Sequence, residues 1–207
     1  MTEKKKIGIM GGTFDPIHLG HLILGEEAYR QLDLDQVLYM PAGNPPHKRN
    51  RTGRAADEDR VQMIRLAIAG NPHFALSLFD MREEGYSYTY RLLETLNSEY
   101  SDCEFYFIMG ADSLVDFDTW MNPQRIANAA HLVVATRNQM SNDSFEALLQ
   151  KRREQYHGDF LRLDTPNLDI SSQHLRELVG SGASVKYYVP DPVLDYIREH
   201  SLYRISE

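Results

Sequence analysis

Short apolar runs alternate along this chain with longer stretches in which apolar residues recur every three or four positions. The runs have the length and flanks of buried strands, and the stretches between them have the spacing of helices that cover a sheet. This alternation predicts an α/β fold built on an open parallel sheet. The predicted strands lie at 7–10, 37–40, 74–79, 104–109, 131–137 and 160–163.

The helical stretches carry their own boundary features. One predicted helix follows the first strand and extends to Leu32, and Asp57 is a candidate N-cap for the next. Residues 140–156 predict a charged, peripheral helix. Since no repeat, low-complexity tract or long linker is visible, we predict a single domain over 1–207. Its C-terminal part, from about 168, would form a small helical appendage that packs on the core.

Composition narrows the class of protein. The net charge of −8 argues against a general nucleic-acid binder, which would need a basic face. No run of 18 or more apolar residues predicts a membrane span, and the basic N-terminus lacks the apolar run of a signal peptide. The single cysteine, Cys103, excludes an internal disulfide and fits a reducing cytoplasm.

The stretch 11–21, GGTFDPIHLGH, joins the first predicted strand to the first predicted helix. Its start, Gly11, Gly12, Thr13 and Phe14, would let the backbone approach a ligand closely, and the following helix start offers N–H groups to an anion. His18 and His21 stand three residues apart, so they share one helix face and could stabilise a bound phosphate. The stretch is neither a dinucleotide fingerprint nor a P-loop. Taken alone, two histidines at this spacing could equally be a surface pair or a metal-site pair.

Further polar groups follow other predicted strands, at the edge where parallel sheets bind ligands. His47 and Lys48 follow the second strand, and Arg137 ends the fifth. Gly110 and Asp112 follow the fourth, where the acid could accept ribose hydroxyls or merely cap the next helix.

A second anion site is predicted at the start of a later helix. There Ile170, Ser171, Ser172 and Arg176 place two hydroxyls and a cation at a loop-to-helix junction.

A polar, aromatic stretch includes Ser87, Tyr88 and Thr89 and leads into a helix. Ser87 or Thr89 could be a helix cap, or the N–H groups there could bind a carboxylate. Trp120, the only tryptophan, is either a core residue or a platform for a flat ring.

Taken together, these motifs resemble those of the bacterial nicotinate-nucleotide adenylyltransferases, within the nucleotidyltransferase superfamily that carries an (H/T)xGH motif. The resemblance covers nearly the whole chain and rests on six segments: 11–21, PPHK at 45–48, DRVQMIRLAI at 59–68, GYSYT at 85–89, FIMGADS with Trp120, and ISSxxxR at 170–176.

The resemblance implies a Rossmann-like, doubly wound parallel sheet flanked by helices. It also implies transfer of AMP from ATP to nicotinate mononucleotide, with Mg²⁺ accompanying ATP and the histidines at its phosphates. Thr89 would hold the nicotinate carboxylate and Trp120 would stack on its ring. We expect these two small molecules as partners, no nucleic acid, no membrane and no metal site built by the protein alone; a homo-oligomer stays open.

The chemistry fits the residues present. A nucleotide phosphate that attacks the α-phosphorus of ATP is already ionised, so positioning and charge neutralisation suffice without a general base. Two alternatives remain open: another acceptor, such as nicotinamide mononucleotide or pantetheine-phosphate, and a non-catalytic nucleotide sensor on the same fold. A fragment of a tRNA synthetase is disfavoured, because no KMSKS-like loop is present.

Overall fold

The computed structural model describes residues 3–43, 54–82, 87–136 and 140–204. In this part of the chain six parallel strands form one sheet in the order β3-β2-β1-β4-β5-β6. The strands are β1 (Lys5–Gly12), β2 (Gln36–Pro41), β3 (Phe74–Leu76), β4 (Cys103–Gly110), β5 (His131–Ala135) and β6 (Phe160–Leu163). The order reverses between β1 and β4, as in the doubly wound fold that the sequence predicts.

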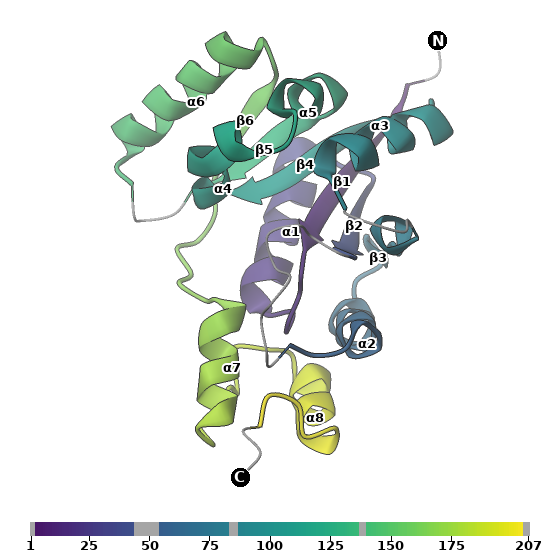
Figure 1. Cartoon of the computed structure of the whole chain (residues 1–207), viewed down its shortest axis with the longest axis vertical. Coiled ribbons are helices and arrows are strands. Elements are labelled where there is room, and N and C mark those ends of the chain that lie inside the picture. The colour runs from purple at the N-terminus through teal and green to yellow at the C-terminus, as the bar shows by residue number, and fades with distance from the viewer. Residues whose placement is uncertain (1–2, 44–53, 83–86, 137–139, 205–207) are drawn as a thin grey trace.

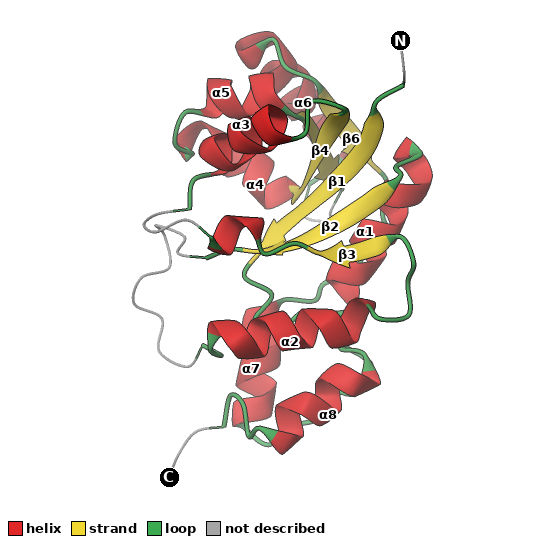
Figure 2. Cartoon of the chain, turned by 90° about the vertical axis from the view of Figure 1, so that its right-hand side faces the viewer, coloured by secondary structure: helices red, strands yellow, loops and turns green. Residues whose placement is uncertain are grey.

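Helices cover both faces of this sheet (Figures 1 and 2). They are α1 (Leu19–Leu32), α2 (Asp57–Ile68), α3 (Thr89–Glu99), α4 (Ala111–Val115), α5 (Pro123–Ala129), α6 (Asn142–Tyr156), α7 (Ser172–Gly180) and α8 (Asp191–Glu199). Two short 3₁₀ helices, η2 (Phe79–Met81) and η3 (Asp116–Thr119), complete the described elements.

The strands divide their side chains between two cores. Along β4, Phe105 and Phe107 pack with residues of α3 to α6, whereas Tyr106 and Ile108 pack with α1, α2 and the C-terminal helices. This alternation explains why β4 reads as a continuous apolar run, because both of its faces are buried. Leu175 of α7 and Val193 of α8 belong to the second core, so these two helices pack against the rest of the molecule. Figure 2 shows α7 and α8 beside α2, below the sheet.

One glycine sets how closely α1 approaches the sheet. A Cβ added to Gly25 would lie 2.3 Å from the hydroxyl oxygen of Tyr39 on β2. That hydroxyl donates to the carbonyl of His21 at 3.2 Å. The absence of a side chain at Gly25 therefore lets β2 hold the first turn of α1 directly.

Two predictions about local structure were wrong. The run at 74–79 forms a strand only to Leu76, and Phe79 begins η2 instead. The strand β3 lies at the edge of the sheet and pairs only with β2. It ends at Leu76 because the pairing with β2 ends there. The N-cap of α2 is Ala56 rather than Asp57, whose carboxylate accepts from the buried Arg60 guanidinium at 2.6 Å.

No helix in the described part of the chain is both long and apolar enough to cross a membrane.

Candidate active site

A cavity of about 340 Å³ opens at the carboxyl ends of β1 and β4, where the strand order reverses. We call it the histidine cavity, since His18 and His21 line one wall. Gly11, from the end of β1, and Gly110, from the end of β4, also line it. This is the position at which open parallel α/β sheets bind their ligands.

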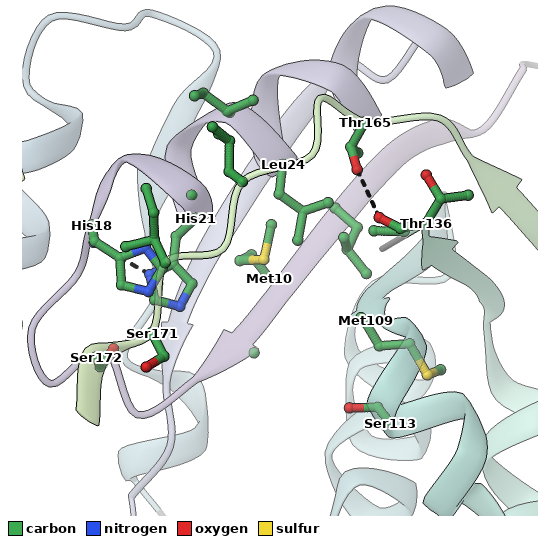
Figure 3. Close-up of a pocket in the computed structure, with 18 of the residues that line it drawn as sticks. Met10, His18, His21, Leu24, Met109, Ser113, Thr136, Thr165, Ser171 and Ser172 are labelled. Carbon is green, nitrogen blue, oxygen red and sulfur yellow. Dashed lines mark hydrogen bonds between the residues drawn. The ribbon is translucent and has the colours of Figure 1, made fainter. Parts of the chain in front are cut away.

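The two histidine rings are held against each other. They stack with centroids 3.7 Å apart and planes 26° apart, and the backbone N–H of His18 donates to Nδ1 of His21 at 3.3 Å (Figure 3). A neutral His21 ring therefore carries its proton on Nε2, which can donate to a ligand. The Phe14 ring meets His21 edge-on, with centroids 5.0 Å apart. Phe14 is buried beneath the motif in a left-handed backbone conformation (φ 49°) and supports the imidazole by packing.

The predicted anion site before α7 is brought to the same cavity. Ile170, Ser171 and Ser172 line it, although 150 residues or so separate them from the motif. The Ser172 hydroxyl donates to the Pro16 carbonyl at 2.9 Å, which fixes α7 beside the motif. The Ser171 hydroxyl caps α7 by accepting from the N–H of His174, and a hydroxyl that accepts in this way can still donate its proton to a ligand.

A second cavity, of about 380 Å³, adjoins the first, and we call it the aromatic cavity. Gly11, Phe107, Ser113 and Trp120 line both cavities. The aromatic cavity is completed by groups from β1, from the loop after β2 and from the start of α3: Gly12, Thr13, Ala42, Ser87, Tyr88 and Thr89. The shared residues make one site with two adjoining compartments.

The start of α3 differs from the predicted cap. Its N-cap is Tyr88, without a side-chain cap, so neither Ser87 nor Thr89 caps the helix. The Ser87 hydroxyl instead donates to the carboxylate of Asp80, at 2.6 Å from Oδ1. Asp80 also lines the aromatic cavity, and sequence reasoning missed it because η2 interrupts what looked like a strand.

Trp120 is partly buried and packs at the edge of the first core. Its ring is partly exposed, packs on Phe107 (centroids 6.2 Å apart) and Phe117 (5.6 Å), and lies between the two cavities. Of the two interpretations open from the sequence, this placement favours the platform.

Arg176 points at the motif loop. Its guanidinium donates to the backbone carbonyl of Asp15 at 2.6 Å and lies 3.7 Å from the Asp15 carboxylate. That carboxylate is 2% exposed, and it also accepts from the Tyr203 hydroxyl at 2.8 Å and lies 3.6 Å from Arg54. We call Asp15, Arg54, Arg176 and Tyr203 the Asp15 cluster. The structure thus shows a structural contact for Arg176, while its predicted contact with phosphate stays a prediction.

Two further predictions concern helix starts. Asp112 lies in the first turn of α4 but does not cap it, because the N-cap is Gly110. The neighbouring Ser113, which sequence reasoning missed, lines both cavities. At α1 one predicted anion donor is already used, since the N–H of Leu19 donates to the carbonyl of Tyr188 at 2.8 Å.

Two hydroxyls on the far side of the histidine cavity were also missed as site residues. Thr136 follows β5, and the Thr165 hydroxyl donates to its carbonyl at 3.1 Å (Figure 3). Thr136 lies inside the predicted strand at 131–137, which ends at Ala135 in the structure, and nothing local indicates Thr165. The predicted ligands His47, Lys48 and Arg137 lie outside the described residues.

The donors around the two cavities are hydroxyls, imidazoles and backbone N–H groups. Within 3–43, 54–82, 87–136 and 140–204, no group of three or more His, Cys, Asp or Glu side chains could hold a metal ion. These donors suit an anionic, phosphate-bearing ligand.

The doubly wound sheet, the histidine pair at its switch point and the hydroxyl-rich cavity define a nucleotide-binding protein of the nucleotidyltransferase class. A family model described as Cytidylyltransferase-like matches residues 9–178. A probable nicotinate-nucleotide adenylyltransferase from Thermomicrobium roseum is 43% identical over 204 residues, which cover 98% of this chain and 93% of the relative. Another probable nicotinate-nucleotide adenylyltransferase, from Lachnoclostridium phytofermentans, is 39% identical over 199 residues, which cover 96% of this chain and 99% of the relative.

The chain belongs to this family, the nicotinate-nucleotide adenylyltransferases, as the resemblance of its motifs predicted. The fold agrees with a solved structure, Plasmodium falciparum nicotinic acid mononucleotide adenylyltransferase complexed with NaAD. That structure has a TM-score of 0.79 at 22% identity and covers 96% of this chain and 97% of its own. The same Plasmodium enzyme complexed with APC gives a TM-score of 0.77, also at 22% identity and with the same two coverages. The predicted Rossmann-like fold is confirmed.

Proposed function

We propose that this protein transfers AMP from ATP to nicotinate mononucleotide, giving nicotinate adenine dinucleotide and pyrophosphate. The observation that carries the proposal is the pair of adjoining cavities. One has the imidazoles and hydroxyls that suit a triphosphate, and the other has an aromatic ring beside a helix start that suits a nicotinate. Their shared border would be where the acceptor phosphate meets the α-phosphorus.

The reaction needs little covalent chemistry from the protein. A phosphate oxygen of nicotinate mononucleotide forms a bond to the α-phosphorus of ATP, while the bond from that phosphorus to the bridging oxygen breaks. The electron pair leaves with pyrophosphate, and no proton has to be removed from the attacking oxygen. Positioning and stabilisation of the developing charge would supply the rate.

His18 and His21 are the residues we assign to charge stabilisation. The hydrogen bond to Nδ1 of His21 presents its Nε2 proton as a donor, and packing against Phe14 keeps the ring in place. Preorganised donors of this kind act without reorganisation at the moment of reaction. Ser171 brings a hydroxyl to the same cavity, whereas Ser172 lines it with a hydroxyl that already donates to the Pro16 carbonyl. We also propose Lys48 and Arg176 at phosphate, although the Arg176 guanidinium contacts Asp15 in this structure.

Nucleotidyl transfer from ATP generally uses a divalent metal ion, and we propose Mg²⁺ here. Mg²⁺ commonly binds through substrate phosphates and water rather than through a cage of side chains. The hydroxyl and imidazole donors of the histidine cavity fit an ion that arrives on the triphosphate. When bound, it would neutralise part of the charge that develops on pyrophosphate.

The acceptor's ring would lie on Trp120, with its carboxylate toward Thr89 and the N–H groups at the start of α3. Ser87 is a weaker candidate for that carboxylate than the sequence indicated, because its hydroxyl is committed to Asp80.

Release of pyrophosphate from ATP, measured with and without nicotinate mononucleotide, tests the proposal. We expect release only when the acceptor is present, together with a dinucleotide product in equal amount. A protein that binds ATP but releases no pyrophosphate with this acceptor, with nicotinamide mononucleotide or with pantetheine-phosphate would be a sensor, and the proposal would be wrong.

A further inference from the structure

Arg152, on α6, is a buried cation that lines neither cavity. It is 3% exposed, and its guanidinium donates to the carbonyls of Leu114 (3.3 Å) and Val115 (3.1 Å). It also donates to the carboxylate of Asp118. Burying a charge is costly unless the charge is fully paired. All three of these partners lie on the short segment 114–118, which suggests that Arg152 serves to hold that segment.

The carboxylate of Asp118 is the second centre of this arrangement. It accepts from the hydroxyl of Tyr156 and from the amide of Gln155 at 3.0 Å, as well as from Arg152. The Asp118 side chain is 45% exposed, and the hydrogen bond from Tyr156, followed by that from Arg152, lowers its pKa against an opposing effect of desolvation. Burial and the same hydrogen bond raise the pKa of Tyr156 to about 12, so at neutral pH the phenol is a donor and the carboxylate is charged.

All these contacts lie on the segment that joins Ser113 to Trp120. The carbonyls of Leu114 and Val115 end α4, where helical carbonyls lack partners within the helix and favour a cation. Beyond Asp118, the N–H of Trp120 donates to the carbonyl of Phe117 at 3.1 Å, and the indole packs on the Phe117 ring. Fixing the segment 114–118 therefore also fixes Ser113 before it and Trp120 after it, and both of these residues line both cavities.

We propose that Arg152, Tyr156 and Asp118 form a clamp whose role is to position Trp120 and Ser113, which makes Arg152 a positioning residue for the aromatic platform. A platform can stack on a flat ring only if its own plane is fixed, and α6 supplies that constraint from outside the site. The enzymatic part of this inference rests on the proposed function, whereas the part that concerns the Trp120 ring does not.

The clamp can be tested optically, because Trp120 is the only tryptophan of the chain. Tyr156→Phe removes the hydroxyl that donates to Asp118 and accepts from the Gln155 amide, with little change in side-chain volume, and Arg152→Gln removes the cation. Their matched controls are Tyr196→Phe, which removes a tyrosine–aspartate hydrogen bond to Asp59 on α2, and Arg153→Gln, which releases the Phe160 carbonyl.

We expect Tyr156→Phe and Arg152→Gln to shift the emission of Trp120 and to raise its quenching by acrylamide, while both controls match the parent. With nicotinate mononucleotide, KM should rise by roughly threefold to tenfold and kcat should change by less than about twofold, because stacking contributes equally to ground and transition states. Should Arg152→Gln fail to fold, Tyr156→Phe still provides the test.

Two results would overturn the clamp. One is a folded Tyr156→Phe protein with the parent's emission, quenching and KM. The other is an equal effect of Tyr196→Phe, which would show a global response. If the parent releases no pyrophosphate, the proposed function fails, but the emission and quenching of Trp120 still decide whether the clamp holds the ring.

Discussion

The carboxylate of Asp15 joins the motif loop to the far end of the chain, and replacing it should be one of the most damaging single changes. Its Oδ1 accepts from the Tyr203 hydroxyl (2.8 Å) and the Ala55 N–H (3.1 Å), while its Oδ2 lies 3.6 Å from Arg54 and 3.7 Å from Arg176. Burial, followed by the charge of Asp15, raises the pKa of Tyr203, so its hydroxyl stays a donor.

Asp15→Asn preserves size but places an NH₂ group among donors. In one amide orientation the NH₂ faces the two guanidinium groups, and in the other it faces the Tyr203 hydroxyl and the Ala55 N–H. Breaking a buried pair of this kind costs about 3–5 kcal/mol, and we expect the lower end because the side chains of Arg54 and Arg176 are 21% and 19% exposed. Tyr203→Phe removes one hydrogen bond to a charged group, which costs about 1.5–3 kcal/mol.

Urea unfolding at pH 7, followed by the fluorescence of Trp120, measures both costs from the midpoint and slope of each transition. Tyr187→Phe is a control without an expected effect, because Tyr187 is 81% exposed. The predicted order is Asp15→Asn, then Tyr203→Phe, then parent and control together. An Asp15→Asn protein within about 1 kcal/mol of the parent would refute the idea that this carboxylate holds the loop.

Three further predictions follow from the site. His21→Ala should lower kcat by roughly 10²-fold or more in a protein that remains folded, and near-normal turnover would remove its catalytic role. Arg176→Lys keeps the charge but loses the planar fork, so both activity and stability should fall, and a variant that matches the parent in steady-state kinetics and urea unfolding would contradict this. The hydrogen bond from Tyr156 lowers the pKa of Asp118 below its ordinary 3.8, so the stability that Asp118 contributes is present above that pH and is lost as the pH falls through the lowered value. The difference in unfolding free energy between parent and Asp118→Asn should therefore be present at pH 7 and shrink below pH 3.8; a difference that does not change with pH would show that the charge is unimportant.

Local sequence was sufficient for most of the sheet and for the motif. The run that became β4 is buried on both faces, which accounts for its continuous apolar pattern. His18 and His21 are close in sequence and do meet, but not on one helix face as predicted, because His18 is the extended N-cap of α1 and contacts His21 through a capping box. Edge positions were harder to predict. Phe79 belongs to η2 although it continues an apolar run, because the pairing with β2 ends at Leu76. Where a partner strand ends cannot be predicted from the local sequence.

The contacts that hold the site together could not be predicted from local patterns. Asp15 and Tyr203 are 188 residues apart, and Arg152 reaches the Leu114 carbonyl from a helix that looked merely charged and peripheral. The same limit applies to Leu19, whose N–H is taken by a carbonyl from a distant segment of the chain. Each depends on the packing of elements whose relative placement only the folded chain defines.

Competition between the acid and the amide nucleotide tests the central claim most directly. With ATP and equal amounts of nicotinate and nicotinamide mononucleotide, the ratio of the two dinucleotide products gives the ratio of kcat/KM values. The N–H groups and the Thr89 hydroxyl at the start of α3 favour a carboxylate. An amide NH₂ would face donors there, and each polar group left unpaired would lower kcat/KM by roughly tenfold to a hundredfold. We predict that the product of the acid exceeds the product of the amide by roughly tenfold or more, and that Thr89→Ala reduces this ratio. Equal amounts of the two products from the parent protein would contradict the account.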